Sequence, residues 1–345
     1  MRIRRLDPSR AITAFASTHD PGLELDLSGL SRSSPFANAV FVAALSGHQL
    51  DLAVRLPPKE TPGTQLLRTV FSSDASDGVF LGRARDLTVR APVRVPGLAL
   101  LPCDSLPVGS RPAFDRILRD TLRTIHASAA AHIFGGISDL IYELTTNAEE
   151  HGRLRPDNSQ TQLSCLVLHH IANPKAPWVD SGSQPELKQY FNAYRSHRPP
   201  PSDGWLNVLV CDGGSGLTYA WVQQHLGKSP YSQTAEAEAF QLERTVIDSR
   251  TTKGARGAVI NTATPPGQGL KCVLQRLALL GGFAAVRTGR LHASMSFPSQ
   301  RLLYEKPSVR DLRLRVESQV PLLGAVWSVM IPLSQQPELA LERGP

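Results

Sequence analysis

The stretch ISDLIYELTTNAEEHG, residues 137–152, decides how the rest of the chain is interpreted. Apolar residues recur in it at the three-to-four spacing of a helix with one buried face, namely Ile137, Leu140, Ile141, Leu144 and Ala148. Beside this stripe runs a polar row with a spacing of four, made by Glu143, Asn147 and His151. Four residues turn a helix by about 400°, so the three side chains point the same way. A carboxylate, an amide and an imidazole on the border of the core predict the floor of a polar pocket.

The chain has 345 residues, enough for two domains or for one domain with large insertions. No uncharged apolar run approaches the roughly eighteen residues of a membrane helix, so we expect no membrane partner. The N-terminus is basic, but no apolar run follows it, which argues against a secretory signal. The four cysteines are scattered, which argues against structural zinc or a disulfide framework. The expected location is the cytoplasm.

The formal net charge is +7, with arginine favoured over lysine. A basic balance can indicate nucleic acid or another polyanion as partner. Here no basic run is interleaved with aromatic residues, which make up only 6% of the chain. Nucleic acid is therefore not the expected partner.

The N-terminal part alternates strand and helix patterns. Strands are predicted at 23–30 and 50–57, and helices at 35–48 and 64–73, the first with Ser34 as its N-cap. This order favours a small α/β unit with parallel pairing. Residues 74–110 are rich in Pro and Gly, and the boundary of this domain is predicted near residue 105.

This unit resembles the STAS-like domain of anti-sigma-factor antagonists. The resemblance spans roughly residues 20–80 and rests on LDLSGL at 25–30, the following turn and helix, a strand ending in Leu-Pro, and a helix with Leu66, Leu67 and Phe71. Family members regulated by phosphorylation carry an Asp-Ser-Ser-Gly type turn before the helix. Here residues 34–36, Ser-Pro-Phe, stand at that place. The resemblance therefore implies a docking or lid domain, 1–105, for a protein partner before it implies a phosphorylation switch.

The second part, residues 106–345, begins with a predicted helix at 113–133 that the Gly135-Gly136 pair ends. Its histidines, His126 and His132, lack the usual context of a phosphoaccepting histidine. After the helix at 137–152 we expect a strand at 161–171, an insertion at about 173–203 with a short helix, a buried strand at 205–212, and a helix at 217–227.

The strand at 205–212 delivers Asp212 into the glycine-rich turn DGGSG. A Rossmann fingerprint requires GxGxxG, a spacing that this turn does not have. A Walker A loop ending in Gly227-Lys228-Ser229 would need a glycine where Val222 stands. Both of these phosphate-binding motifs are excluded. Asp212, Gly214 and Gly216 instead match the DxGxG box of the GHKL superfamily of gyrase, histidine-kinase and mismatch-repair ATPases.

Two further boxes of that superfamily occur in the same order. The first is the polar row of the helix at 137–152, and the last is GQGL at 267–270, which a helix and the strand at 283–289 follow. The resemblance covers roughly residues 113–333. It implies an α/β sandwich of the Bergerat type, a mixed sheet with helices on one face, ending in the strand at 322–333. One departure is Ala325, where the family often has threonine after a glycine.

The resemblance also implies roles for the boxes. Asp212 would accept a hydrogen bond from the adenine amino group, with Gly214 and Gly216 in the same ATP-binding turn. Asn147 would hold Mg²⁺ through its amide oxygen. Glu143 would orient and deprotonate the attacking water or hydroxyl.

The remaining implied contacts concern the phosphates. Gly267, Gly269 and Leu270 would offer backbone N–H groups at a helix N-terminus. Residues 217–266 would form a lid over ATP, from which Lys253 could reach the γ-phosphate or simply face solvent. His151 either lies next to the phosphates or interacts with the dipole of its own helix.

The expected function is that of an Mg²⁺-dependent ATP-binding enzyme, with three alternatives. It could be a slow ATPase that works as a nucleotide-controlled switch. It could be an anti-sigma-type protein kinase that phosphorylates a serine on a STAS-like partner. It could also be an ATP-binding interaction module without turnover. A homodimer is compatible with each alternative.

Overall fold

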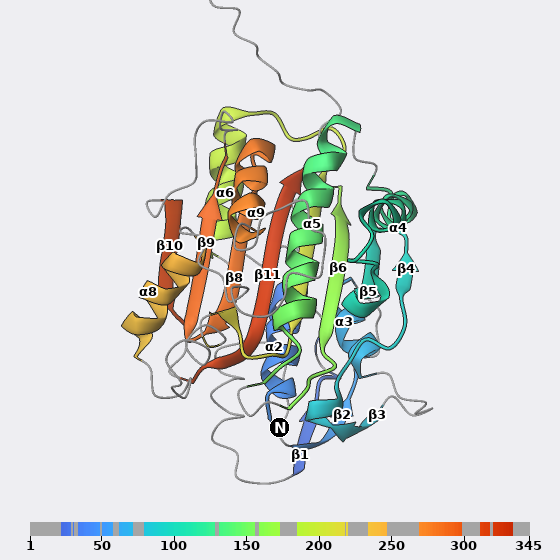
Figure 1. The fold of residues 1–345 in the computed structure, drawn as a ribbon. Helices are drawn as coiled ribbons and strands as arrows, with labels where there is room; N and C mark the ends of the chain where they lie inside the picture. The colour runs from blue at the N-terminus through green and yellow to red at the C-terminus, as the bar shows by residue number, and fades with distance from the viewer. Residues whose placement is uncertain are drawn as a thin grey trace, which may run out of the picture.

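The computed structural model describes residues 22–28, 30, 34–48, 50–57, 62–71, 79–127, 131–155, 159–172, 185–217, 219, 234–246, 269–298, 311–317 and 320–333. They form an α/β protein with a three-stranded sheet and an eight-stranded sheet, and helices cover both faces of the larger one (Figure 1). The α/β class expected from the sequence is confirmed.

The larger sheet has the strand order β10–β9–β8–β11–β7–β6–β5–β4. Its strands are β4 (Val93–Val95), β5 (Leu98–Pro102), β6 (Ser164–Ile171), β7 (Trp205–Asp212), β8 (Phe283–Gly289), β9 (Leu291–Ser296), β10 (Leu312–Val316) and β11 (Leu322–Pro332). Every neighbouring pair is antiparallel, so the expected mixed sheet is wrong for the described strands. Tight turns join β4 to β5 and β8 to β9, and a tight turn can join only antiparallel strands; the other neighbouring strands have longer connections, which do not fix their direction.

Among the described residues, the helices on one face of this sheet share a core with it (Figure 1). They are α4 (Arg111–Thr124), α5 (Ala131–His151), α8 (Ala235–Val246) and α9 (Gly269–Leu280). Their apolar sides share one core with alternate strand residues such as Val208, Val210 and Trp327. The central helix α5 packs along α9, which brings the first and third sequence boxes to neighbouring helices.

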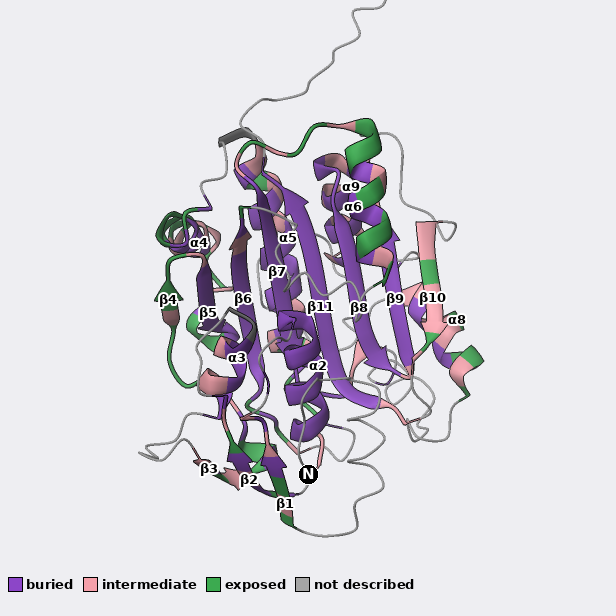
Figure 2. Ribbon diagram, turned by 180° about the vertical axis from the view of Figure 1, so that it is seen from behind, coloured by how far each residue is buried: buried purple, intermediate pink, exposed green. Residues whose placement is uncertain are grey.

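The opposite face is covered by α2 (Pro35–Ser46) and α6 (Pro185–His197), as Figure 2 shows. The expectation of helices on one face only is therefore wrong. The reason lies in the strands themselves: all residues of β7 and β11 are buried, so both faces need a cover. In β7, Val208 faces the α5 side, whereas Leu209 and Cys211 face the α2 side.

Helix α2 is the most buried element of the N-terminal unit, because each of its 12 residues is buried. It begins as the sequence predicts, with Pro35 in the first turn and with the Ser34 Oγ accepting a hydrogen bond of 3.0 Å from the Ala37 N–H. It packs against β7 and β11 on one side and against α3 (Pro62–Val70) on the other. The helix is therefore shared between the two predicted domains.

The smaller sheet consists of β1 (Gly22–Asp26), β2 (Asp51–Arg55) and β3 (Val79–Arg83). The parallel pairing predicted for the first two strands is confirmed, and β3 is antiparallel to β2. A boundary at residue 105 does not divide the core, because β4 and β5 precede that residue and are strands of the larger sheet. In this region Pro96 and Gly97 form the turn between β4 and β5, whereas Gly82 and Pro102 lie within strands.

Helix boundaries near the Gly135-Gly136 pair also differ from the prediction. The pair lies inside α5, and α4 ends at Thr124, just before His126, which has a positive φ of 58°. A Cβ on Gly136 would lie 3.6 Å from the Leu280 side chain, so the helices pack closely there. The chain thus turns at His126, a residue that no local pattern marked.

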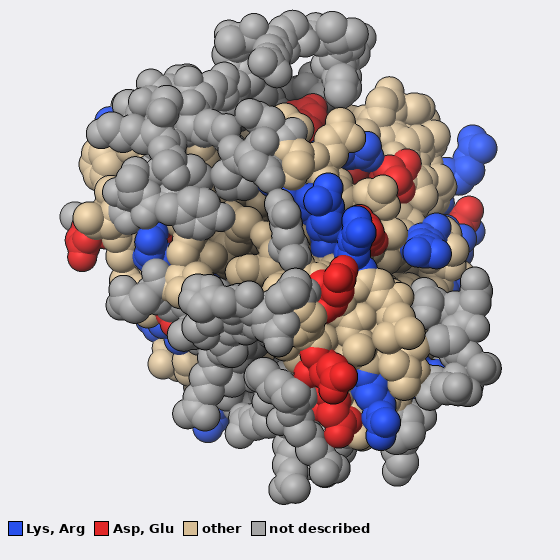
Figure 3. Space-filling model, turned by 90° about the horizontal axis from the view of Figure 1, so that it is seen from below, with Lys and Arg blue, Asp and Glu red and all other residues tan. Residues whose placement is uncertain are grey.

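Two 3₁₀ helices, η1 (Ala84–Asp86) and η2 (Cys103–Ser105), connect the sheets and lead into α4. Within the described ranges, no helix combines the length and apolar character needed to cross a membrane. On the face seen from below, basic and acidic side chains lie next to one another (Figure 3). This mixed arrangement differs from the continuous basic area typical of a nucleic-acid-binding face.

Because the two predicted domains share a core, we expect them to unfold together. Phe41 of α2 is fully buried, so Phe41→Ala should destabilise the protein by about 3–5 kcal/mol. All four tryptophans, at 178, 205, 221 and 327, lie beyond residue 105. We expect the midpoint of tryptophan fluorescence in denaturant to fall together with that of the far-UV circular dichroism signal.

The matched control is Leu81→Ala on β3, because this side chain is 71% exposed and its loss should change stability by less than about 0.5 kcal/mol. An unchanged tryptophan transition in Phe41→Ala would contradict a common core and would show that the N-terminal unit unfolds by itself.

Candidate functional site

The first meeting point of the predicted boxes lies between α5 and α9. Glu143 and Asn147 stand one turn apart on α5, and Gly269 is the first residue of α9. A Cβ on Gly269 would lie 2.6 Å from the Glu143 Oε2 and 3.7 Å from the Asn147 Nδ2. Glycine is therefore the residue that lets the N-terminus of α9 approach the polar row. The helix N-terminus and the row form one continuous polar surface.

The polar row is largely enclosed. Glu143 is buried although it is a carboxylate, and Asn147 is half-buried. The Asn147 Nδ2 is a buried atom to which the described part of the structure offers no hydrogen-bond partner. Buried amide groups normally have partners, so this end of the side chain is suited to an additional ligand.

The second meeting point lies between the end of α5 and the turn after β7. A Cβ on Gly152 would lie 2.5 Å from the Asp212 Cβ, and one on Gly214 would lie 2.5 Å from the Gly152 carbonyl oxygen. No side chain fits at either position without movement of the backbone or of Asp212. The first and second boxes are therefore in direct contact through two glycines.

Asp212 is held in a defined orientation. Its Oδ1 accepts hydrogen bonds from the backbone N–H groups of Gly214, at 3.1 Å, and Ala325, at 3.2 Å. Burial raises the pKa of the carboxyl to about 7, and the two N–H donors partly oppose that rise. With Oδ1 occupied, Oδ2 is the oxygen that remains for a ligand, and it can accept a hydrogen bond when the group is ionised.

The turn after Asp212 is packed against β8 and β11. Gly216 has a positive φ of 80°, and a Cβ there would lie 2.7 Å from the Thr288 Oγ1. The Thr288 hydroxyl accepts from the Leu217 N–H at 3.1 Å and donates to the Gly324 carbonyl at 3.2 Å. Gly216 is thus required by the turn and its packing, and the expected contact with a ligand stays a prediction.

The remaining predicted site residues are Leu270, His151, Lys253 and Gly267. The Leu270 side chain belongs to the core under α9, so only its backbone could face a ligand. His151, at the last position of α5, is half-buried, and its Nε2 lies 3.9 Å from the Glu150 Oε2. Lys253 and Gly267 lie outside the described residues.

The expected lid, 217–266, is described at Leu217, Tyr219 and 234–246. Within it, the fully buried Glu238 of α8 accepts hydrogen bonds from the Tyr219 hydroxyl, at 2.6 Å, and from the Arg290 backbone N–H, at 2.8 Å. The Arg290 guanidinium also forms an ion pair with Glu238. These contacts anchor α8 to the turn between β8 and β9. The expected helix at 217–227 is otherwise outside the described ranges.

Two residues near the turn were not singled out from the sequence. Thr288 is the residue before the last in β8, and no local pattern distinguishes it from a packing residue. Arg155 follows α5 by four residues and is buried, although it is an arginine in a polar loop. Neither position carries a sequence signal, because both partners of Thr288 and the Ser46 and Arg85 acceptors of Arg155 are distant along the chain.

Comparisons of the chain with protein-family models, with curated proteins and with solved structures each returned no match.

Proposed function

We propose that the surface formed by α5, α9 and the turn after β7 binds Mg·ATP, and that the protein is a slow ATPase that acts as a nucleotide-controlled switch. The observation that supports this most strongly is the meeting of three distant segments around the Asp212 carboxylate and the polar row of α5. Each segment has the residue type that one part of ATP requires.

In this proposal Asp212 recognises the base. Its Oδ1 is held by two backbone N–H groups, so Oδ2 is directed to the adenine amino group. Gly214 has no side chain where the Gly152 backbone lies, so it keeps the base-recognising turn in contact with the end of α5. Guanine carries an acceptor where adenine carries this amino group, so the ionised Asp212 would reject it.

The phosphates would lie toward the N-terminus of α9, where backbone N–H groups and the helix dipole favour an anion. The amide oxygen of Asn147 is the type of ligand that hydrated Mg²⁺ takes, and the buried, unpartnered Nδ2 could donate to a phosphate oxygen. When bound, Mg²⁺ would neutralise charge on the phosphates. Among the described residues no group of three or more His, Cys, Asp or Glu side chains is arranged to hold a metal ion, so phosphate and water oxygens would complete its coordination.

Glu143 would supply the base. It stands one turn before Asn147 and beside the N-terminus of α9, where the terminal phosphate would lie. Its carboxylate would orient a water molecule and accept its proton as the oxygen attacks the terminal phosphorus. Burial excludes bulk water from this position, which favours a single ordered nucleophile.

Two substitutions separate binding from turnover. Glu143→Gln should keep ATP affinity within about threefold and lower the rate of phosphate release at least about a hundredfold. Asn147→Ala should weaken ATP binding in the presence of Mg²⁺ and leave the weaker Mg²⁺-free binding unchanged. Calorimetric titration and a phosphate-release assay measure these effects, and full turnover by Glu143→Gln would contradict the role of the base.

A protein kinase of the anti-sigma type is the second candidate, since the same site could direct a serine hydroxyl of a partner to the terminal phosphate. Incubation with γ-labelled ATP distinguishes the two: free phosphate indicates hydrolysis and labelled protein indicates phosphotransfer. If ATP does not raise the melting temperature of the wild-type protein, both the ATPase and the protein kinase functions are contradicted, as is the non-hydrolysing ATP-binding module.

A further inference from the structure

The Arg155 side chain connects segments that are distant along the chain. Its Nη2 donates to the carbonyls of Ser46, at the end of α2, and of Arg85, in η1, each at 3.1 Å. Its Nη1 donates to the Gln160 carbonyl at 2.9 Å and to the Ser159 Oγ at 3.4 Å. The guanidinium is buried, and burial of a charge is costly unless such partners are present.

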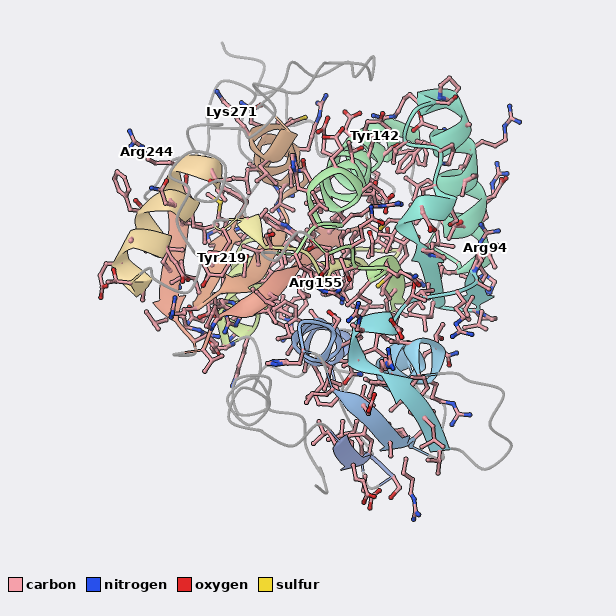
Figure 4. All side chains as sticks on the ribbon, turned by 60° about the horizontal axis from the view of Figure 1, so that its bottom comes forward. Arg94, Tyr142, Arg155, Tyr219, Arg244 and Lys271 are labelled. Carbon is pink, nitrogen blue, oxygen red and sulfur yellow. The ribbon has the colours of Figure 1, made fainter. Side chains whose placement is uncertain are left out.

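One of these contacts caps a helix. The last four carbonyls of a helix lack intrahelical backbone partners, and the last turn of α2 has no basic residue of its own. Arg155 supplies the cation that the negative end of the helix dipole favours. In Figure 4 Arg155 is labelled just above α2, where the N-terminal unit meets the larger sheet.

The loop that carries Arg155 also frames the turn after β7. The Ser215 Oγ donates to the Leu154 carbonyl at 2.7 Å. On the other side, a Cβ on Gly213 would lie 2.7 Å from both the Thr161 Oγ1 and the Ser46 Oγ. The turn with Asp212 is therefore enclosed between this loop and the end of α2, and Arg155 joins these two supports.

We propose that Arg155 is a positioning residue that sets the base-recognising turn, and that through it base recognition depends on the N-terminal unit. This inference rests on the proposed ATP binding. Arg155 acts through the loop and the end of α2, and it has no part in phosphate chemistry. Its loss should therefore affect every adenine nucleotide equally, whatever its number of phosphates.

The test compares Arg155→Met with Arg153→Met in calorimetric titrations of ATP, ADP and GTP, with and without Mg²⁺. Arg153 lies in the same loop but is exposed, and it forms an ion pair with Glu149 of the preceding helix, α5. It is therefore the matched control. For Arg155→Met we expect ATP and ADP to weaken by the same factor, about tenfold, with or without Mg²⁺. The preference for ATP over GTP should narrow, and the turnover number at saturating ATP should not change.

The inference would be overturned if Arg155→Met bound ATP and ADP as tightly as wild type and kept the wild-type preference for ATP over GTP. It would also be overturned if ATP affinity fell only in the presence of Mg²⁺. If wild-type protein binds no ATP, the proposed function itself fails. Arg155→Lys is the second variant, since it keeps the charge but cannot reach all four acceptors, and it should fall between wild type and Arg155→Met.

A measurement on unaltered protein covers the case in which the variants do not fold. ATP should slow amide hydrogen exchange at 43–47, the end of α2, as well as at 212–216. Exchange at 43–47 that ATP leaves unchanged would overturn the inference.

Discussion

Replacing Asp212 by asparagine is expected to raise the stability of the protein at pH 8 and, at the same time, to abolish its preference for ATP. Both effects follow from the buried carboxylate. An asparagine Oδ1 can still accept from the Gly214 and Ala325 N–H groups, so the turn keeps its shape. The amide nitrogen then occupies the place of Oδ2, where the buried negative charge is lost.

The stability gain depends on pH. In an unfolded chain an aspartate titrates near pH 3.9. In the folded protein burial raises the pKa of Asp212 to about 7, so the folded state binds more protons between these values and stability falls as pH rises. Above pH 7 the folded protein carries the full penalty. The neutral amide should remove about 2 kcal/mol of it at pH 8 and nothing at pH 4.

The loss of ATP preference has a hydrogen-bonding cause. The asparagine NH₂ would face the adenine amino group, donor against donor, so ATP should weaken on the order of a hundredfold. Guanine presents an acceptor at that place, so the affinity for GTP should not fall. Thermal unfolding at pH 4 and pH 8 and titrations with both nucleotides measure the two effects.

The exposed Asp86 provides the control, because Asp86→Asn should change neither stability nor binding. If Asp212→Asn melted at or below the wild-type temperature at pH 8, the stability penalty assigned to the buried, ionised carboxylate would be contradicted. Unchanged ATP affinity would contradict its role in base recognition.

The second large effect is expected from Gly152→Ala, which should lower the free energy of unfolding by about 3 kcal/mol. The added Cβ would lie 2.5 Å from the Asp212 Cβ, a separation that requires movement of β7 or of the end of α5. Because Asp212 is displaced, the ATP-dependent rise in melting temperature should also disappear.

The control lies at the other end of the same segment. Gly136→Ala places a Cβ 3.6 Å from the Leu280 side chain, which is ordinary contact, inside α5. There alanine should stabilise the protein by about 0.5–1 kcal/mol, since glycine is unfavourable in a helix interior. Chemical denaturation compares both variants. If both variants changed the free energy of unfolding by the same amount, the contact with Asp212 would not be the cause of the destabilisation by Gly152→Ala.

Local sequence patterns predicted several features correctly. Ser34 and Pro35 marked the start of α2, and the apolar run of β7 ended at Asp212 as expected. Such features depend on residues within one or two turns or on a single strand, so their signal is complete within a short window. The polar row on α5 belongs to the same class.

Other predictions failed because their cause is not local. The Gly135-Gly136 pair has the chemistry of a helix end, but both residues lie inside α5, which packs along α9. The strands β4 and β5 lie among turn residues, but β5 pairs with β6 and β4 pairs with β5, so both extend the larger sheet. Tertiary contacts overrode the local preference at each of these places.

The sequence by itself determined that α5 presents Glu143 and Asn147 on one side, because helix periodicity places residues four apart on the same face. Only the tertiary structure decided what that row meets: Gly269 at the start of α9, and, through Gly152, the Asp212 turn. The tertiary structure also decided that α2 covers the opposite face of the sheet. Arg155 binds the end of α2 through the Ser46 carbonyl, 109 residues earlier in the chain. Periodicity reports the faces of one element, whereas burial depends on which distant elements come together to cover them.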